Sequence, residues 1–357
     1  FYVLELAKAL QARQHDVLVV CKPDNLLYQK CLDAGVPARA VGFPAQGRLM
    51  SHVLKLGEMI RRHRSQIVHT NSNYDRTAGA FAARLFGAVH ITNVHSFHSL
   101  RHNLTHWFRN TRATDHYIVD GLCVKDLLVR EDRIPAEKIS VVYLGVDPAT
   151  MRRDEALRRN VREEFGYSGR EIVIGNVARL VPFKGQEYLL KAFGEVHREH
   201  PDARLLIIGD GELRDRLSAL AGTLGLDTKV SFAGFRDDLQ AVYSAFDIYA
   251  HSSVEGGGET FPFAVLQALA EELPVVATRV GDVAEMVREG ISGFLVPDRD
   301  PSRLAQKLIV LSRDAALRLE MSRQGRELLL RRFTTTSMVD AVENLYTLAL
   351  PARSSRG

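Results

Sequence analysis

Residues 172–209, with the sequence IVIGNVARLVPFKGQEYLLKAFGEVHREHPDARLLIIG, decide the fold class of this chain. The stretch opens on an apolar run at 172–176 and closes on another at 205–209, and each run has the length and composition of a buried strand. The segment 186–200 between them carries apolar residues at helical spacing. Two buried strands joined by a helix predict a βαβ unit, in which the strands are parallel.

The same alternation extends to both sides of this stretch. Further buried strands are predicted at 16–21, 38–41, 67–70, 91–94, 117–119, 139–143, 230–233, 248–251, 275–278 and 293–296. A break in the pattern at Gly145, Asp147 and Pro148 separates two such series. We therefore expect an α/β fold of two Rossmann-like domains, 1–148 and 149–335, facing each other across a cleft. A helix at 336–350 is expected to pack back on the first domain, and a disordered tail is expected at 351–357.

The composition is that of a globular protein. Of the 357 residues, 46% are hydrophobic and 25% are charged, which excludes a disordered or fibrous chain. No apolar run approaches the ~18 residues of a membrane-spanning helix, and no secretory signal opens the sequence. Three cysteines, an odd number, indicate a reducing compartment, so we expect a cytoplasmic protein. The sequence begins inside an amphipathic helix, which predicts that a strand precedes it outside this sequence.

The charge is unevenly distributed. Residues 1–148 contain 19 Lys and Arg against 13 Asp and Glu, whereas the remaining residues contain 28 against 30. A basic first domain fits an anionic partner. The segment 49–64 places apolar residues on one helical face and three arginines at its end. Two interpretations stay open for this helix: an ordinary core-facing helix with cations at its C-terminal dipole, or contact with an anionic membrane surface.

Several familiar site motifs are absent from the sequence. The run IIGDG at 207–211 starts like a dinucleotide-binding fingerprint, but Arg214 stands where that motif needs another glycine. The P-loop, CxxC and HExxH motifs are also missing. Nucleic acid is not expected as a partner, because the basic residues are not interleaved with aromatic ones. No metal site is expected from the histidines that recur without acidic or cysteine partners, which are His95, His98, His102 and His106.

Two basic residues follow the predicted strand at 172–176. Arg179 and Lys184 lie on the loop to the next helix, at the carboxyl end of the strand. Their offset across a turn allows a guanidinium and an ammonium group to converge on one anion. Solvated loop cations are the alternative interpretation. The isolated His251 is predicted to be a surface or loop residue.

Residues 255–272, EGGGETFPFAVLQALAEE, directly follow another predicted strand. Three glycines allow close backbone approach, and Pro262 suits the first turn of the helix that follows. The free N–H groups and the dipole at this helix start form an anion site. Glu259 would repel a phosphate there, so we expect it to accept hydrogen bonds from the hydroxyls of a neutral polyol. Gln267 lies two turns into the helix, on a side from which it can also reach the cleft.

These segments together resemble a known family. GNVARLVPFKG, LLIIGDGELRDRL, VSFAGFRDDLQAVYSAFDIYAHSS, EGGGETFPFAVLQALA and ISGFLVPDRDP follow the order and spacing of the retaining GT-B glycosyltransferases of family 4. The first domain resembles the family's acceptor domain through residues 1–21, IVHTNSN, ITNVHSFHS and VVYLGVD. The resemblance implies sugar transfer from a nucleotide diphosphate sugar to a glycan or lipid-linked acceptor, without a bound metal or other cofactor. It also implies a role in the synthesis of cell-envelope polysaccharide or glycolipid.

The resemblance assigns roles residue by residue. Arg179 and Lys184 match the pair that neutralises the donor diphosphate. Glu259 matches the first Glu of the family's E-x7-E motif, near the sugar hydroxyls, and His95 matches the acceptor-domain histidine that faces the reacting centre. The loop beside the nucleotide base is matched by Phe235, Arg236 and Asp237. Further donor contacts are implied at Gly211, Thr260, Phe261, Pro262 and Phe263.

The sequence departs from the family pattern at two places. Gln267 stands where the family has a second Glu that binds the ribose hydroxyls, so the charge-assisted form of that contact is lost. The strand and Gly-rich loop that open the family's first domain are not in this sequence. Two other interpretations therefore stay open: a catalytically silent relative that binds sugar nucleotides or glycans, and a nucleotide-sugar epimerase or phosphorylase of the same fold.

Overall fold

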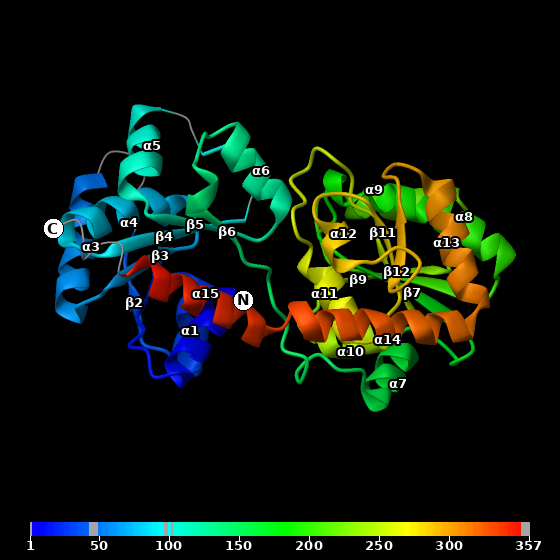
Figure 1. Cartoon of the computed structure of the whole chain (residues 1–357). Helices are drawn as coiled ribbons and strands as arrows, with labels where there is room; N and C mark the ends of the chain where they lie inside the picture. Colours follow the sequence, from blue (N-terminus) through cyan, green and yellow to red (C-terminus); the bar gives the residue numbers. More distant parts are fainter. Residues whose placement is uncertain (1, 43–48, 96–98, 101–102, 351–357) are drawn as a thin grey trace. The chain divides into compact units, whose positions relative to one another are not determined.

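The structure, a computed structural model, describes residues 2–42, 49–95, 99–100 and 103–350. The chain forms two compact units (Figure 1). The first unit consists of Phe1–Leu144 together with Thr335–Gly357, and the second unit is Gly145–Thr334. Strands in both units are parallel and alternate with helices, so the predicted α/β class is confirmed.

The second unit is built on a six-stranded sheet. Its spatial order is β12-β11-β10-β7-β8-β9, and all neighbouring strands are parallel. The strands are β7 (Ile172–Val177), β8 (Ala203–Ile208), β9 (Val230–Gly234), β10 (Ile248–His251), β11 (Val275–Thr278) and β12 (Gly293–Val296). The order reverses between β7 and β10. At such a reversal the loops leaving the carboxyl ends of two neighbouring strands diverge, which opens room for a ligand.

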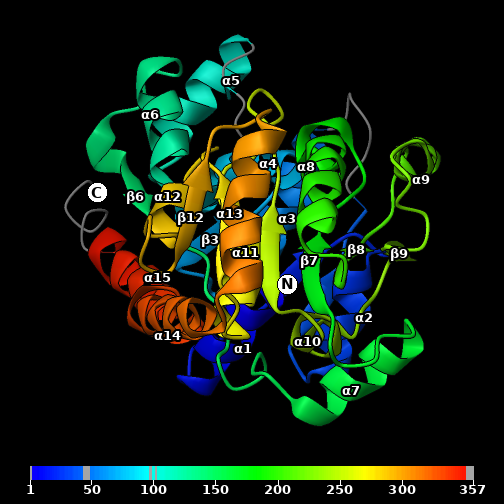
Figure 2. The same cartoon turned by 90° about the vertical axis from the view of Figure 1, so that its right-hand side faces the viewer.

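Helices cover both faces of this sheet. On one face α8 and α13 lie side by side (Figure 2), and with α9 they bury the apolar side chains of that face. On the other face Phe246 packs directly on Gly175 of β7, where an added Cβ would lie 2.1 Å from the phenyl ring. The helices of this unit are α7 (Glu155–Glu164), α8 (Gln186–Glu199), α9 (Arg214–Thr223), α10 (Leu239–Ser244), α11 (Phe263–Ala270), α12 (Val283–Met286), α13 (Pro301–Arg313) and α14 (Ala315–Arg332). Because both faces are covered, the strands consist mainly of apolar residues.

The first unit contains two groups of parallel strands. β1 (Val19–Cys21) pairs with β2 (Ala38–Ala40), and a four-stranded sheet follows the order β3-β4-β5-β6. The strands of that sheet are β3 (Ile67–Thr70), β4 (Val89–Val94), β5 (His116–Val119) and β6 (Ile139–Val141). The helices before and between these strands are α1 (Tyr2–Ala12), α2 (Leu26–Asp33), α3 (Leu49–His63), α4 (Asn73–Phe86), α5 (Leu104–Phe108) and α6 (Leu122–Arg130).

The last helix, α15 (Thr335–Ala349), completes the core of the first unit. Its residues Met338, Val339, Val342 and Leu345 are buried against α1 and against β4, β5 and the residue after β6. Ion pairs fix the same contact, because Arg13 reaches Asp340 at 2.6 Å and Glu343 at 2.5 Å. The first unit is therefore assembled from the two ends of the chain.

α4 begins at Asn73, where the carboxylate of Asp75 accepts a hydrogen bond from the Ser72 amide at 3.0 Å and caps the helix. Residues 104–113 were not predicted as helical, yet they form α5 and a π-helical turn, η1 (Arg109–Ala113). Over the residues that the structure describes, no helix has both the length and the apolar character needed to cross a membrane.

The contact between Gly175 and Phe246 yields a test of the packing. Replacement of Gly175 by Ala should lower the free energy of unfolding by about 1–3 kcal/mol, because the new methyl group overlaps the ring in a core that cannot expand freely. Gly194→Ala is the matched control. An added Cβ on this helical glycine of α8 would lie 3.9 Å from Leu226, so this variant should be as stable as the wild type or more stable. Urea unfolding measures the free energy of unfolding of both variants. A Gly175→Ala variant as stable as the wild type would contradict this packing.

Candidate active site

A buried ion pair lies at the carboxyl edge of the second unit's sheet. The Lys184 ammonium, on the short helical turn after β7, donates to Glu259 Oε2 at 2.5 Å. The hydroxyl of Ser253, just after β10, donates to the same oxygen at 2.6 Å. Only 15% of the Lys184 side chain and 8% of the Glu259 side chain are exposed. Two residues that sequence reasoning assigned to a donor site are thus brought together where the strand order reverses.

The surroundings keep Glu259 ionised. Burial alone would raise the pKa of this carboxyl group, but the nearby His251 ring and the Lys184 ammonium group outweigh burial and hold the pKa well below its ordinary value. His251 Nε2 lies 3.4 Å from Glu259 Oε2. An ionised carboxylate flanked by an ammonium group can accept hydrogen bonds from hydroxyl groups while the ammonium group faces an anion.

The position of His251 corrects the sequence prediction. It was expected on the surface or in a loop, but it is the last residue of β10 and is only 1% exposed. The physical reason is its place in the sheet, because β10 lies between β7 and β11 and its carboxyl end is covered by the loop that carries Glu259. Its position eight residues before Glu259, at the end of an apolar run, was the available signal.

Arg179 has the exposure expected of an anion-binding group. It lies on the same loop as Lys184, its guanidinium group stands over the Phe183 ring at 5.8 Å, and it has no ion-pair partner among the described residues. The backbone carbonyl of Arg179 accepts a hydrogen bond from the buried Gln186 at 3.0 Å, which fixes the loop. The guanidinium group is therefore free to bind an anion beside the Lys184 ammonium group.

Glycines let the loops at this edge approach one another. A Cβ on Gly211 would lie 2.5 Å from the Leu180 carbonyl oxygen, and Gly211 has φ +158°. A glycine at this predicted donor position therefore lets the loop after β8 contact the loop after β7 directly. Likewise, a Cβ on Gly281 would lie 2.6 Å from the Glu259 carbonyl oxygen. Close backbone approach is thus a requirement of the fold around the ion pair.

The segment after Glu259 is mostly buried. Thr260 and Phe261 are 6% and 4% exposed, and the Phe261 ring packs 5.7 Å from that of Phe333. Pro262 occupies the N-cap of α11, one position before the first turn where it was predicted, and Phe263 begins the helix. α11 therefore begins directly after the Glu259 loop.

Gln267 is held inside the unit. It is 7% exposed, and its Oε1 lies 3.3 Å from the Tyr243 hydroxyl, which also lies 3.0 Å from the Ala264 carbonyl oxygen. Burial raises the pKa of Tyr243 well above its ordinary value, so the phenol remains a donor. The residue that replaces the family's second Glu thus has an internal partner that sequence spacing did not reveal.

The segment after β9 has one free and one fixed side chain. Phe235 is 80% exposed, whereas Arg236 bonds to both carboxylate oxygens of Asp238, at 2.7 and 2.6 Å, and to Glu164 of α7 at 2.6 Å. Hydrogen bonds to these carboxylates raise the pKa of Arg236 above its ordinary value. Asp237 is exposed. Phe235 is therefore available for stacking on a planar ligand, while Arg236 anchors the loop.

His95 belongs to a polar cluster in the first unit. It follows β4, with Nδ1 3.4 Å from Asp120 Oδ2 and Nε2 3.1 Å from Asn71 Oδ1. Asn93 donates to the same Asn71 oxygen at 2.8 Å. Oxygen atoms therefore face both ring nitrogens of His95. His98 and His102 lie outside the described residues, and among the residues that are described no group of three or more side chains is arranged to hold a metal ion.

The cluster around His95 continues to the C-terminal helix. Burial lowers the pKa of His69 to about 4, so this ring is neutral at physiological pH. His69 Nδ1 lies 2.6 Å from the Tyr346 hydroxyl, and its Nε2 lies 2.9 Å from Asn93 Oδ1. A neutral ring that donates to Asn93 must accept from Tyr346. The hydrogen bonds thus run from Tyr346 of α15 through His69 and Asn93 to Asn71, which contacts His95.

Comparison with known proteins supports an assignment at the level of the family. Residues 158–328 match the family model described as glycosyl transferases group 1, and residues 1–150 match the model for glycosyltransferase family 4. Alpha-D-kanosaminyltransferase of Streptomyces kanamyceticus is 26% identical over 86% of this chain and 83% of that protein. UDP-Gal:alpha-D-GlcNAc-diphosphoundecaprenol alpha-1,3-galactosyltransferase of Escherichia coli is 26% identical over 96% of this chain and 92% of that protein. The structure of Anabaena HepE in complex with UDP-glucose aligns with a TM-score of 0.83 and 22% identity over 97% of this chain and 94% of that one, which shows a shared fold.

The Glu259 ion pair predicts a pH-dependent stability. A carboxyl group whose folded-state pKa is depressed stabilises the fold above its unfolded pKa, near 4.5, and this stabilisation is lost as the pH falls through the folded value. Glu259→Gln should therefore cost about 2–4 kcal/mol at pH 7, because it leaves the Lys184 charge buried and unpaired, and the difference should shrink below pH 4.5.

Urea unfolding at pH 7 and at pH 4 measures this difference. Glu320→Gln is the control, because Glu320 pairs with Arg323 on the surface and its loss should cause no resolvable change. A difference between wild type and Glu259→Gln that stays constant with pH would show that the ion pair does not carry the stabilisation.

Proposed function

Because this chain belongs to the group 1 glycosyl transferases and has their GT-B fold, we propose that it transfers a sugar from a nucleotide diphosphate sugar to a glycan or lipid-linked acceptor, with retention at the anomeric carbon. The observation that carries this proposal is the Lys184–Glu259 pair beside the free Arg179. It combines two cations for a diphosphate with a carboxylate for sugar hydroxyls at one sheet edge.

We assign each part of the donor to a different group of the second unit. Arg179 and Lys184 bind the diphosphate, Glu259 accepts hydrogen bonds from the sugar hydroxyls, and the exposed Phe235 stacks on the base. The HepE structure with UDP-glucose supports a donor of this class. As the bond from the sugar C1 to the leaving phosphate breaks, negative charge builds on the phosphate, and the two cations stabilise it without a resident metal ion.

The acceptor fits the first unit. His95 is held by Asn71 and Asp120, so its ring can orient an acceptor hydroxyl or a sugar hydroxyl at the reacting centre. Front-side attack assisted by the leaving phosphate explains retention, since no second carboxylate is assigned to a double displacement. The name of the Escherichia coli relative, with its diphosphoundecaprenol-linked acceptor, supports a lipid-linked glycan of the cell envelope. The excess of basic residues in the first unit supports a location at the inner face of the membrane.

A catalytically silent binding protein is the second candidate. The observation that favours it is that Gln267, which stands in place of the family's second Glu, is buried, with its Oε1 3.3 Å from the Tyr243 hydroxyl. Such a protein would bind a nucleotide sugar through Arg179 and Phe235 but would not turn it over.

A thermal-shift screen against nucleotide sugars, followed by a turnover assay, tests the proposed transfer. Binding raises the melting temperature, and release of nucleoside diphosphate reports turnover. Arg179→Ala should lower kcat/KM by about 10²–10³, because a charge that stabilises the leaving phosphate is removed. Arg323→Ala, at an exposed arginine of α14, is the matched control and should leave kcat/KM unchanged. Binding without turnover would instead support the silent relative, and interconversion of nucleotide sugars without acceptor would indicate an epimerase.

Gln267→Glu tests the ribose contact separately. A carboxylate can accept from both Tyr243 and a ribose hydroxyl, so the KM for the donor should fall by roughly fivefold, equivalent to about 1 kcal/mol. Gln306→Glu, at an exposed glutamine of α13, is the control. An unchanged KM in the Gln267 variant would dismiss this position as a ribose contact.

A further inference from the structure

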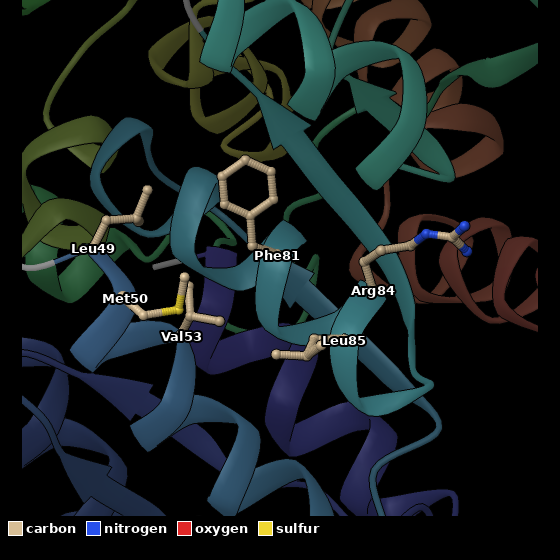
Figure 3. Close-up of a pocket in the computed structure, with 6 residues that line it drawn as sticks. All are labelled: Leu49, Met50, Val53, Phe81, Arg84 and Leu85. Carbon is tan, nitrogen blue, oxygen red and sulfur yellow. The ribbon is translucent and has the colours of Figure 1, made fainter.

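The pocket between α3 and α4 of the first unit presents little chemistry to a ligand. It has a volume of about 580 Å³, and five of its six lining residues are apolar. The sixth is Arg84, whose guanidinium group extends away from the pocket (Figure 3). A buried polar group without a partner points to chemistry more directly than an apolar pocket does. One such group in the second unit, His251, lies beside the ion pair of the candidate active site.

His251 is a buried residue whose ring lacks a close partner. It is the last residue of β10 and is almost completely buried. Among the residues that the structure describes, neither of its ring nitrogens makes a hydrogen bond. Its Nε2 is nevertheless only 3.4 Å from Glu259 Oε2. A buried polar group without a hydrogen bond destabilises a fold, so a histidine at this position indicates a role that an apolar residue could not fill.

The occupancy of Glu259 Oε2 explains the long distance to His251. This oxygen already accepts from the Lys184 ammonium group at 2.5 Å and from the Ser253 hydroxyl at 2.6 Å. A carboxylate oxygen offers about two acceptor positions, so these donors leave no position for a third. The His251 ring therefore remains close to the oxygen without bonding to it.

Lys184 and His251 differ in how far their side chains can move. The backbone carbonyl of Lys184 accepts a hydrogen bond from the Ser252 hydroxyl at 2.9 Å, which fixes the backbone at this position. Its ammonium group ends a flexible four-carbon stem and lies 5.2 Å from the centre of the Phe183 ring, over which the Arg179 guanidinium group also stands. The ammonium group can therefore turn towards an anion held by Arg179. The His251 ring is short, buried and anchored in the strand, so it stays beside Glu259.

From these contacts we propose that His251 is a positioning residue, which bonds to Glu259 when a diphosphate draws the Lys184 ammonium group away. The ammonium group then contacts phosphate oxygens, and His251 donates to the position that it leaves on Oε2. Because a carboxylate oxygen only accepts, Nε2 carries the hydrogen in that bond. The carboxylate keeps its place and remains an acceptor for sugar hydroxyls. This exchange rests on the diphosphate binding proposed above.

Unfolding in urea at pH 7 tests the exchange without a ligand. His251→Leu alone should change the unfolding equilibrium constant little, because Lys184 still pairs with Glu259. In a Lys184→Met background the same change should raise that constant at least about tenfold, because the carboxylate then loses its second nitrogen donor. His251→Gln should behave as histidine does in both backgrounds, since its amide nitrogen can also donate. Equal effects of His251→Leu in the two backgrounds would overturn the proposal.

His197→Leu is the matched control for the unfolding comparison. His197 lies in the last turn of α8, whereas Lys184 precedes the first turn of the same helix. Its replacement should therefore have the same effect on the unfolding equilibrium constant with and without Lys184→Met.

Titration calorimetry with UDP, GDP and ADP tests the exchange at a diphosphate. His251→Leu should weaken binding of the preferred nucleotide at least about fivefold, because moving Lys184 then leaves the carboxylate without a nitrogen donor. His251→Gln and His197→Leu should bind as the wild type does. Unchanged affinity in His251→Leu would overturn the exchange. A wild type that binds none of the three would instead refute the proposed donor site, and the unfolding comparison would still decide whether His251 can pair with Glu259.

Discussion

The loops at the carboxyl edge of the second unit's sheet are arranged around the buried ion pair of Lys184 and Glu259. Two charges withdrawn from water destabilise a fold unless geometry and further hydrogen bonds compensate for the lost hydration. Here Ser253 and His251 supply that compensation from the end of β10, and the ammonium group arrives from the neighbouring strand β7. These groups meet only if the loops lie within backbone contact, which explains why Gly185 stands where any Cβ would lie 2.1 Å from the Ser252 carbonyl oxygen.

The same constraint connects fold to chemistry. A site that must recognise a diphosphate and a sugar needs cations and a hydroxyl acceptor within the length of one ligand. The strand reversal between β7 and β10 supplies two diverging loops, and the ion pair fixes the acceptor between them. Arg179 adds a cation that has no ion-pair partner in the part of the chain that the structure describes. In the transfer reaction that we propose, this charge arrangement is already formed before a donor binds, so little reorganisation is needed when phosphate charge develops.

The sequence was sufficient for the fold class, and it assigned Lys184 and Glu259 to one predicted site, where the structure pairs them. Parallel strands buried on both faces appear as continuous apolar runs, so β7, β8, β10 and β11 were all recognisable. His251 was misplaced because burial of a polar residue depends on which strands flank β10, and spacing carries no such information. The link from Tyr346 to His69 joins residues 277 positions apart, and the partner of Gln267 comes from another helix. Side-chain partnerships of this kind arise only from the tertiary packing.

The packing of α15 on the first unit has a consequence for how the chain folds during synthesis. Domains generally fold in the order in which the ribosome releases them. The second unit is continuous, so all of its strands and helices have emerged before α15 is made. The first unit begins earlier but cannot cover Leu6, Leu10 and Ile91 until the last helix appears. The order is therefore inverted: the part translated first stays open longest, and the final fifteen-residue helix closes it.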